Sequence, residues 1–274
     1  KGRRMKNSAI KSQNNQTMPS RSRLWTPHRL PHLIAWHSVR TLQNLAVDDQ
    51  AEFFYDVSGN GNALRQTSEV KRPTVAESSD FGNLKILEFV AAENNLMTKT
   101  TPPDSLDIGT GDFFFCCACK VGSYSSNNTI MSLQRESDDE LRLFINNSEQ
   151  FVFRITGSEV AQVSTSLENT VNLLYAERIN GTMKVFVNGT VGSVTDTSST
   201  DITSNTAVVL GALNTSSSQD YTGEIAEVVY GGSTSTGIMN DKRRQLLEGY
   251  MAHRCNISSR LVSTHPYKYG PPRV

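Results

Sequence analysis

One stretch decides the fold class of this chain: Tyr175-Ala-Glu-Arg-Ile-Asn-Gly-Thr-Met-Lys-Val-Phe-Val-Asn-Gly189. Its two halves are rich in strand-forming residues, and the Asn180-Gly181 pair between them best fits the tight turn of a β-hairpin. A second Asn-Gly pair, at positions 188 and 189, follows the returning strand. The stretch therefore predicts two antiparallel strands, residues 170–178 and 182–187.

Further short strands, separated by turn residues, are predicted on both sides of this hairpin. Glu140-Leu-Arg-Leu-Phe-Ile145 alternates apolar and polar residues, which is typical of a half-buried strand. No alternation of strands with helices is present, so the pattern favours an antiparallel sandwich over a parallel sheet. The other expected strands span residues 113–121, 129–134, 150–156, 207–211 and 223–230.

The two ends of the chain read differently from the middle. Residues 240–254 predict a closing helix, with Asn240 as its N-cap and an apolar face made of Leu246, Leu247, Tyr250 and Met251. The Pro-rich tail after it cannot continue the helix and is expected to be extended. Near the start, residues 24–33 resemble a loop, and residues 34–45 fit a helix or a strand equally well.

Length and composition allow a domain with a sizeable core of its own. The chain has 274 residues, of which 37% are hydrophobic and 20% charged. Its longest apolar run, around residues 112–120, is far shorter than the roughly 20 residues that a membrane span needs. The first thirty residues are polar and basic and lack the apolar stretch of a secretory signal, so we expect no membrane partner.

The net charge of zero conceals a basic start and an acidic remainder. Nine of the 27 Lys and Arg residues and none of the 27 acids precede Asp48, which leaves 18 bases against 27 acids, or −9, in the rest. A basic arm on an acidic body is suited to docking on an acidic neighbour, which could be another copy, a different protein or nucleic acid. A disordered solubilising tail is the alternative.

We therefore divide the chain into an extended basic arm, residues 1–29, and one domain, residues 30–274. Met18 offers an alternative start, in which case residues 1–17 are an added segment. Nucleic acid is the least favoured partner, because the arm has only Trp25 among its basic residues. The predicted partner-binding residues are the basic ones of the arm: Lys1, Arg3, Arg4, Lys6, Lys11, Arg21, Arg23 and Arg29.

The four cysteines predict reduced, buried thiols. Cys116, Cys117 and Cys119 lie on one expected strand, and their spacing does not match a pair of zinc ligands two residues apart. Cys255 is remote in sequence. No disulfide framework is implied, so the protein does not require an oxidising compartment.

A series of short motifs runs through most of the chain in a characteristic order. They are Arg23-Leu-Trp-Thr-Pro27, Asp56-Val-Ser-Gly-Asn-Gly61, Arg72-Pro-Thr74, the 175–189 hairpin, Val209-Leu-Gly211, Tyr221-Thr-Gly-Glu-Ile-Ala-Glu-Val-Val229, Leu247-Glu-Gly-Tyr-Met-Ala-His253 and His265-Pro-Tyr-Lys268. Together they resemble the concanavalin A-like (laminin-G-like) jelly roll, in the version common in virion and tail proteins of bacteriophages. The resemblance implies an all-β, two-sheet antiparallel sandwich closed by one C-terminal helix. One departure is that Ile34-Ala-Trp-His-Ser38 lacks the aspartate usual in that strand.

The family includes glycoside hydrolases of the laminarinase type, in which two carboxylates of one strand point into a cleft. The nearest candidates here are Glu224 and Glu227, which are three apart and therefore expected on opposite faces of a strand. Asp138-Asp139-Glu140 falls in a turn. We expect these acids to be solvated. The chain also lacks the G-x-S-x-G turn of a serine hydrolase, so we predict no catalytic residues and no enzyme activity.

Metal ligands are not predicted either. His28 and His32 have a helical ligand spacing, but the adjacent Pro27 and Pro31 place them in a loop. Loop oxygens suitable for calcium occur at Asp56, Asn60, Asp112 and Asp220, and nothing in their spacing selects them. Turn formation is the expected role of Asp56 and Asn60. We predict no cofactor, with calcium left open.

Two functions remain as hypotheses. The first is a non-enzymatic structural protein of a phage virion that decorates or cements the capsid, docked through its arm on other virion subunits and on copies of itself. The alternative is a glycan-binding adhesin of the tail or baseplate, with loop aromatics such as Tyr124 or Tyr221 as contacts for a surface glycan. In both hypotheses the protein is located in the virion.

Overall fold

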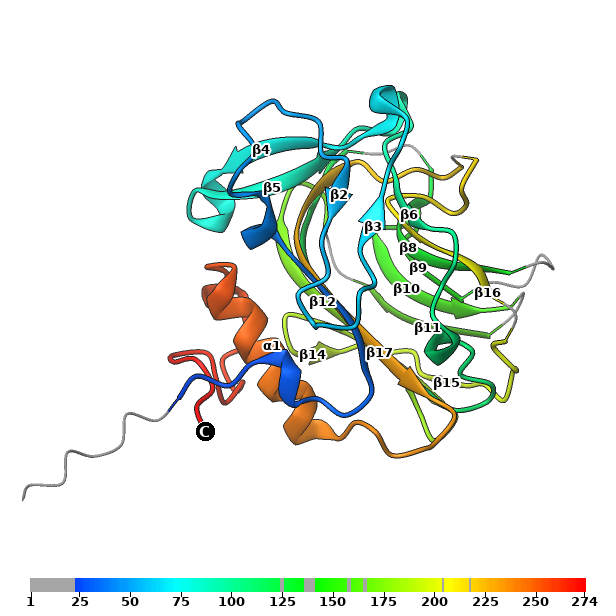
Figure 1. The fold of residues 1–274 in the computed structure, drawn as a ribbon. Coiled ribbons are helices and arrows are strands. Elements are labelled where there is room, and N and C mark those ends of the chain that lie inside the picture. Colours follow the sequence, from blue (N-terminus) through cyan, green and yellow to red (C-terminus); the bar gives the residue numbers. More distant parts are fainter. Residues whose placement is uncertain are drawn as a thin grey trace, which may run out of the picture.

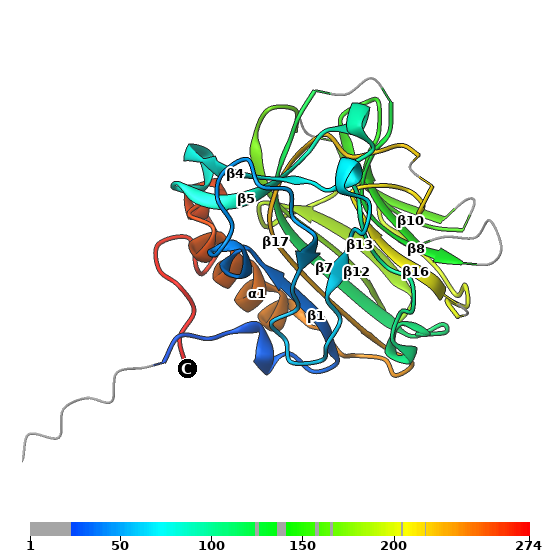
Figure 2. The same ribbon diagram turned by 45° about the horizontal axis from the view of Figure 1, so that its top comes forward.

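The computed structural model describes residues 23–123, 126–135, 141–156, 159–164, 167–203, 205–216 and 218–274. Two antiparallel β-sheets pack face to face, and one α-helix, α1 (Asp241–Arg254), covers the outer face of the first sheet (Figures 1 and 2). This is the all-β sandwich with a C-terminal helix that the sequence predicts, and that prediction is confirmed.

The first sheet has the strand order β14-β13-β12-β7-β17-β5-β4. At its centre β7 pairs with β12 on one side and with β17 on the other. The far edge of β17 is shared, because β5 pairs with its beginning and β1 with its later part. The strands are β1 (Leu33–Ser38), β4 (Thr74–Ser78), β5 (Leu84–Phe89), β7 (Asp112–Val121), β12 (Val171–Ile179), β13 (Thr182–Val187), β14 (Thr190–Val191), β15 (Asp196–Thr197) and β17 (Gly223–Ser233).

The second sheet has the order β11-β10-β9-β8-β16-β6-β3-β2, so that β2 is an edge strand. Its strands are β2 (Phe53–Phe54), β3 (Leu64–Arg65), β6 (Met97–Lys99), β8 (Asn128–Arg135), β9 (Leu141–Ile145), β10 (Gln150–Ile155), β11 (Glu159–Ser164) and β16 (Asn205–Leu210). Several 3₁₀ helices fill the connections, among them η1 (Pro27–Arg29) and η2 (Val39–Leu42).

The core lies between the sheets and continues beneath α1. In β7 every second side chain points inward, and the rings of Phe113 and Phe153 from opposite sheets approach with centroids 6.0 Å apart. The intervening residues of β7 face α1, which buries Leu247 and Met251. Both faces of this strand are therefore covered, which explains why its sequence is continuously apolar.

The hairpin that decides the fold is confirmed in detail. Asn180 and Gly181 have φ values of 50° and 76°, the left-handed conformation that a type I′ turn needs. Asn188 and Gly189 likewise have φ values of 54° and 83°. The ambiguous stretch 34–45 resolves into strand β1 followed by η2. The strands that were not predicted are β2, β3, β4, β5, β6, β11, β14 and β15.

The expectation that residues 140–145 form a half-buried strand is wrong. Strand β9 is buried on both faces, and Arg142 is only 2% exposed. Its guanidinium lies 4.0 Å from the centre of the Phe144 ring and donates to the Thr129 hydroxyl at 2.9 Å. A polar residue on the outer face can be buried here because its donors find partners there.

The four thiols are buried and unpaired, as predicted. Burial raises the pKa of Cys116, Cys117 and Cys255 well above the ordinary value, which keeps these thiols protonated and unreactive. Within the described part of the chain, no helix is long and apolar enough to cross a membrane.

The closing helix begins as predicted, because the Asn240 side chain accepts a hydrogen bond from the Arg243 amide at 2.9 Å. We expect Asn240→Ala to lower the free energy of unfolding by about 1 kcal/mol, the usual value of an N-cap. Asn240→Asp should keep the stability close to that of the unchanged protein. Urea denaturation of the three proteins measures this, and an unchanged midpoint for Asn240→Ala would show that the cap contributes nothing.

Candidate functional site

Three surface hollows are candidates for ligand sites in the described part of the chain. The first, the platform hollow, has a volume of about 370 Å³ and lies between η2 and the edge strand β2. The second and third lie beside the two ends of α1. The residues of the platform hollow are Thr41, Asn44, Leu45, Gln50, Glu52, Phe53, Tyr55 and Arg72.

The platform hollow is built on two stacked aromatic rings. Phe53 and Tyr55 flank the fully buried Phe54, so the strand alternation sends both rings to the same side. Their planes are 15° from parallel and their centroids are 5.3 Å apart. Tyr55 is 50% exposed and Phe53 is partly exposed. The outcome is a flat aromatic surface open to solvent.

A network of ion pairs holds the aromatic rings of the platform in place. The Arg65 guanidinium lies 5.1 Å from the centre of the Phe53 ring and donates to Glu52 through Nε at 2.9 Å and Nη2 at 2.6 Å. The Arg72 guanidinium lies 3.2 Å from the other Glu52 oxygen and donates to the Gln66 carbonyl. Glu52 is therefore fixed between two arginines, and Phe53 is fixed by one of them.

Two amide side chains beside the platform keep their hydrogen-bonding capacity. Asn44 and Gln50 are exposed, and neither side-chain amide bonds to any described residue. Each amide offers two donors and one acceptor. A ligand on the Tyr55 ring would thus meet both apolar surface and directional polar groups, the usual composition of a small-molecule site.

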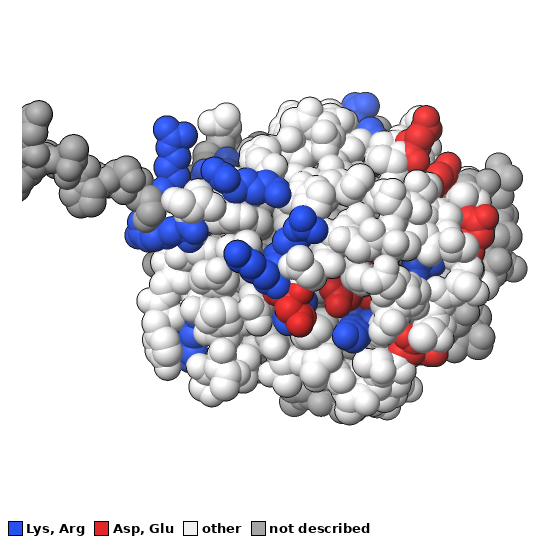
Figure 3. Space-filling model, turned by 90° about the horizontal axis from the view of Figure 1, so that it is seen from below, with Lys and Arg blue, Asp and Glu red and all other residues white. Residues whose placement is uncertain are grey.

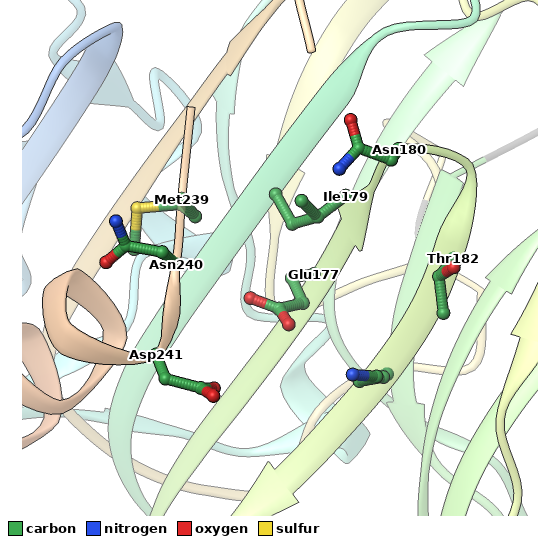
Figure 4. Close-up of a pocket in the computed structure, with 8 residues that line it drawn as sticks. Glu177, Ile179, Asn180, Thr182, Met239, Asn240 and Asp241 are labelled. Atoms are coloured by element: carbon green, nitrogen blue, oxygen red, sulfur yellow. The ribbon is translucent and has the colours of Figure 1, made fainter. Parts of the chain in front are cut away.

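The second hollow, the acidic hollow, has a volume of about 360 Å³ and lies at the beginning of α1. Figure 4 shows Glu177 of β12 and Asp241 of α1 turned toward the same space. Burial raises the pKa of Glu177, although the Tyr175 hydroxyl donates to it at 2.9 Å. Asp241 accepts from Arg244 at 3.2 Å. Both carboxylates are thus engaged by neighbours, and sequence reasoning did not bring them together.

The expectation that Glu224 and Glu227 lie on opposite faces of a strand is wrong. A bulge in β17 between Ile225 and Glu227 shifts the register, so that Glu224 pairs with Lys120 and Glu227 with Ala118. Those partners are two residues apart on β7, which places both acids on the face that α1 covers. No spacing rule predicts a bulge, and here it reversed the assignment.

The expectation that both acids are solvated is wrong for Glu227, which is fully buried. It accepts hydrogen bonds from the Trp36 indole and the Cys255 thiol, and Arg254 Nε lies 3.9 Å from its Oε2. Burial raises the pKa of Glu227 to about 7. Glu224 accepts from Ser78 and lies 3.7 Å from the Lys120 ammonium, so the two acids have separate partners.

The loop oxygens considered for calcium are mostly occupied by protein donors. The Asp56 carboxylate accepts from the amides of Trp36, Ser58 and Asn62 at 2.8–2.9 Å and from the Ser58 hydroxyl. Burial alone would raise the pKa of Asp56, but these hydrogen bonds outweigh it and lower the pKa. The Asn60 amide donates to the Leu33 carbonyl, so the expected turn role of both residues is confirmed.

Asp112 and Asp220 are the other two residues considered as calcium ligands. Asp112 is buried and accepts from the amides of Asn180 and Ile238 at 2.8 and 3.0 Å. Burial raises the pKa of Asp220. Among the described residues, no group of three or more His, Cys, Asp or Glu side chains is placed to hold a metal ion. His28 bonds to the Val57 carbonyl, while His32 is exposed in its loop.

Of the predicted arm, Arg23 and Arg29 are described, and both are exposed. Arg23 lies beside the C-terminus, because its carbonyl accepts from the Val274 amide at 2.9 Å. Trp25, inside the predicted arm, is 4% exposed and belongs to the core. Lys1, Arg3, Arg4, Lys6, Lys11 and Arg21 lie outside the described residues. In Figure 3 most basic side chains lie toward the side from which the grey segment leaves.

Of the two aromatic residues named for a glycan contact, Tyr221 does not supply one. Tyr221 is fully buried, and its hydroxyl donates to the Lys120 carbonyl at 2.9 Å. Tyr124 lies outside the described residues. Among the described residues, two tyrosines are exposed, Tyr55 beside β2 and Tyr269 in the tail, and the sequence analysis missed Tyr55. The signal was present, since two aromatics flank a third at strand spacing in Phe53-Phe-Tyr55.

Comparison with known proteins identifies the type of β-sandwich fold. Residues 98–233 match the family model of the concanavalin A-like lectin/glucanases superfamily. The fold is concanavalin A-like. No curated protein matches the sequence.

Solved structures with a similar fold include carbohydrate-active proteins. Domain 4 of AbnA, a GH43 extracellular arabinanase from Geobacillus stearothermophilus in complex with arabinotriose, has a TM-score of 0.54 and 15% identity, over 76% of this chain and 96% of that chain. Trypanosoma rangeli sialidase in complex with sialic acid has a TM-score of 0.51 and 10% identity, over 78% of this chain and 32% of that chain. This chain spans about a third of the length of this sialidase, and the similarity shows the fold alone.

Proposed function

We propose that this protein is a non-catalytic carbohydrate-binding protein that holds an oligosaccharide on the platform hollow. The observation that carries the proposal is the half-exposed Tyr55 ring, stacked on Phe53 and flanked by the unpaired amides of Asn44 and Gln50. One face of a sugar ring is largely apolar C–H surface, while its hydroxyls need directional partners. The platform hollow offers both kinds of contact side by side.

The similarity to Domain 4 of AbnA supports this proposal, because that domain was solved in complex with arabinotriose. Arabinotriose is therefore a suitable first probe, together with an array of neutral oligosaccharides. We expect saturable binding to at least one neutral oligosaccharide, measured by calorimetry. Binding to none of them would contradict the proposal.

Hydrolysis is the outcome that would point to a different function. The acidic hollow is the place to localise it, because two carboxylates line it. We expect no release of reducing ends from arabinan or laminarin, since both carboxylates are held by neighbouring side chains. Turnover that disappears in Glu177→Gln would replace the proposal with a glycosidase.

Most of the basic arm lies outside the described residues, so the geometry bears on glycan binding and not on capsid decoration. Decoration of a phage virion through the basic arm stays a prediction. So do the virion location and the association with other subunits or copies. Mass spectrometry of purified virions tests these predictions. Absence of the protein from the virions would count against capsid decoration and against a tail or baseplate adhesin.

A further inference from the structure

The third hollow, the tryptophan hollow, lies where residues 24–26, Pro271 and the last turn of α1 meet. Its volume is about 520 Å³, within the range of small-molecule sites. This hollow is not part of the carbohydrate site proposed above. The residues that line it are Leu24, Trp25, Thr26, Trp36, Arg40, Tyr250, His253, Arg254 and Pro271.

Three aromatic side chains form the floor of this hollow. The Tyr250 ring meets Trp36 edge to face at 5.6 Å and 84°, and meets Trp25 at 6.1 Å and 66°. All three rings are less than a tenth exposed, so the hollow exposes only small parts of a tightly packed cluster. The Trp36 indole N–H is already used by Glu227 beneath the floor. The floor is therefore rigid and apolar toward the hollow.

Two guanidinium groups stand over this floor. Arg40 is exposed, and its guanidinium makes no hydrogen bond or ion pair with any residue that the structure describes. Arg254 lies 3.9 Å from Glu227, and its side chain is 21% exposed. Its Nε is buried without a hydrogen-bond partner in the described structure. Arg40 and the two terminal nitrogens of Arg254 therefore retain donors that a ligand could use, whereas the buried Arg254 Nε faces Glu227.

The residues that line the hollow include two arginines and no acidic side chain. Glu227 supplies one buried carboxyl against the two guanidinium groups. The end of a helix exposes four carbonyls that would repel an anion, but here three of them accept hydrogen bonds from the chain that follows. The carbonyls of Met251, Ala252 and His253 accept from the amides of Cys255, Ile257 and Asn256.

We propose that the tryptophan hollow binds a sugar acid, with its carboxylate on Arg40 and Arg254 and its ring over the tryptophan floor. A planar guanidinium matches a carboxylate with two parallel hydrogen bonds, which a hydroxyl cannot reproduce. The chain's own residues 1–22 do not fit as occupant, because they contain six bases and no acid. This site is separate from the platform hollow and does not rest on it.

Tryptophan fluorescence reports on this hollow selectively. The chain has two tryptophans, Trp25 and Trp36, and both belong to the floor. We expect D-glucuronate to give a saturable change in fluorescence. D-glucose, which has the same ring without the carboxylate, should give none, and acetate should bind more weakly than glucuronate because it lacks the ring. An equal response to glucose and glucuronate would overturn the proposal.

The variant Arg40→Gln tests the role of the guanidinium without disturbing the fold, because Arg40 is exposed. We expect the affinity for glucuronate to fall roughly tenfold to a hundredfold, the usual effect of losing a charge-assisted hydrogen-bond pair. Lys242→Gln, which removes an exposed charge at the other end of α1, is the matched control and should leave the affinity unchanged. Unchanged binding in Arg40→Gln would refute the site.

The two proposed sites can be told apart with one further variant. Tyr55→Ala should leave glucuronate binding intact, and Arg40→Gln should leave the neutral oligosaccharide intact on the platform. If Tyr55→Ala removes glucuronate binding, the sugar acid occupies the platform hollow and the assignment to the tryptophan hollow is wrong. Arg254→Lys, which keeps the charge but loses the fork, should weaken glucuronate binding while the fold is retained.

Discussion

Tyr55→Ala is expected to weaken oligosaccharide binding by roughly thirtyfold, which corresponds to about 2 kcal/mol, the loss typical of a central aromatic contact. The ring is half exposed and contributes little to the core, so its removal takes away ligand contact and not folding. Calorimetric titration with arabinotriose, or with the best neutral oligosaccharide from an array, measures the loss.

Two further variants separate stacking from general effects on the surface. Tyr55→Phe keeps the ring and should bind within about threefold of the unchanged protein, because the hydroxyl has no partner in the described structure. Tyr269→Ala removes a tyrosine that is 87% exposed and lies outside the three hollows, and should have no effect. Equal losses for Tyr55→Ala and Tyr269→Ala would show that the platform is not the site.

The difference in free energy of unfolding between Glu227→Gln and its parent is expected to favour the variant more at pH 8 than at pH 4.5. Burial raises the pKa of Glu227 from 4.5 to about 7 in the folded state. Between these pH values the folded protein keeps a proton that the unfolded chain has released, so the free energy of unfolding falls as pH rises. The loss amounts to about 3 kcal/mol over this window, and glutamine cannot undergo it.

The groups that face Glu227 come from every element around it. They are Trp36 of β1, Arg40 of η2, Tyr250, Arg254 and Cys255 at the end of α1, and Cys116 of β7. Glu224→Gln, on the same strand but partly exposed, is the control. Chemical denaturation at pH 4.5, 6 and 8 gives the comparison. A stability difference between Glu227→Gln and its parent that does not change with pH would contradict this assignment.

A second buried group, His37, makes the free energy of unfolding depend on pH in the opposite direction. Burial lowers the pKa of His37 from 6.5 to about 4, so the unfolded chain takes up a proton below pH 6.5 that the folded protein refuses. The free energy of unfolding therefore falls as pH falls from 6.5 to 4. Between pH 4.5 and 6.5 the two groups act in opposite directions. The effect of Glu227 is therefore clearest as a difference between variant and parent.

The fold was predictable where local chemistry decides the structure. Each Asn-Gly pair needs positive φ values that few other residues adopt, and Asn240 caps a helix whose apolar face is visible in its spacing. The alternation rule failed at β9 and β17. In β9, Arg142 is buried through contacts with Phe144 of its own strand, Thr129 of β8 and Gln219 of a distant loop. In β17 the bulge beside Glu227 changed which side chains share a face.

The candidate sites were less predictable than the fold, because each is assembled from separate segments. The platform hollow combines residues of η2, of β2 and its flanks, and Arg72, which adjoin only after the sheets form. The tryptophan hollow needs residues 24–26, the 36–40 segment, Pro271 and the end of α1. In each hollow the candidate contact is recognised by the solvent exposure of a side chain, Tyr55 in the platform hollow and Arg40 in the tryptophan hollow. The sequence does not reveal that Tyr221 is buried while Tyr55 is open.

The most direct test of the central claim is a map of amide chemical shifts in the NMR spectrum of the protein titrated with its best neutral oligosaccharide. The platform hollow predicts that the largest shifts fall in residues 41–55 and at Arg72, with saturation at the affinity found by calorimetry. Shifts confined to the acidic hollow, around residues 177–184 and 239–241, would contradict it.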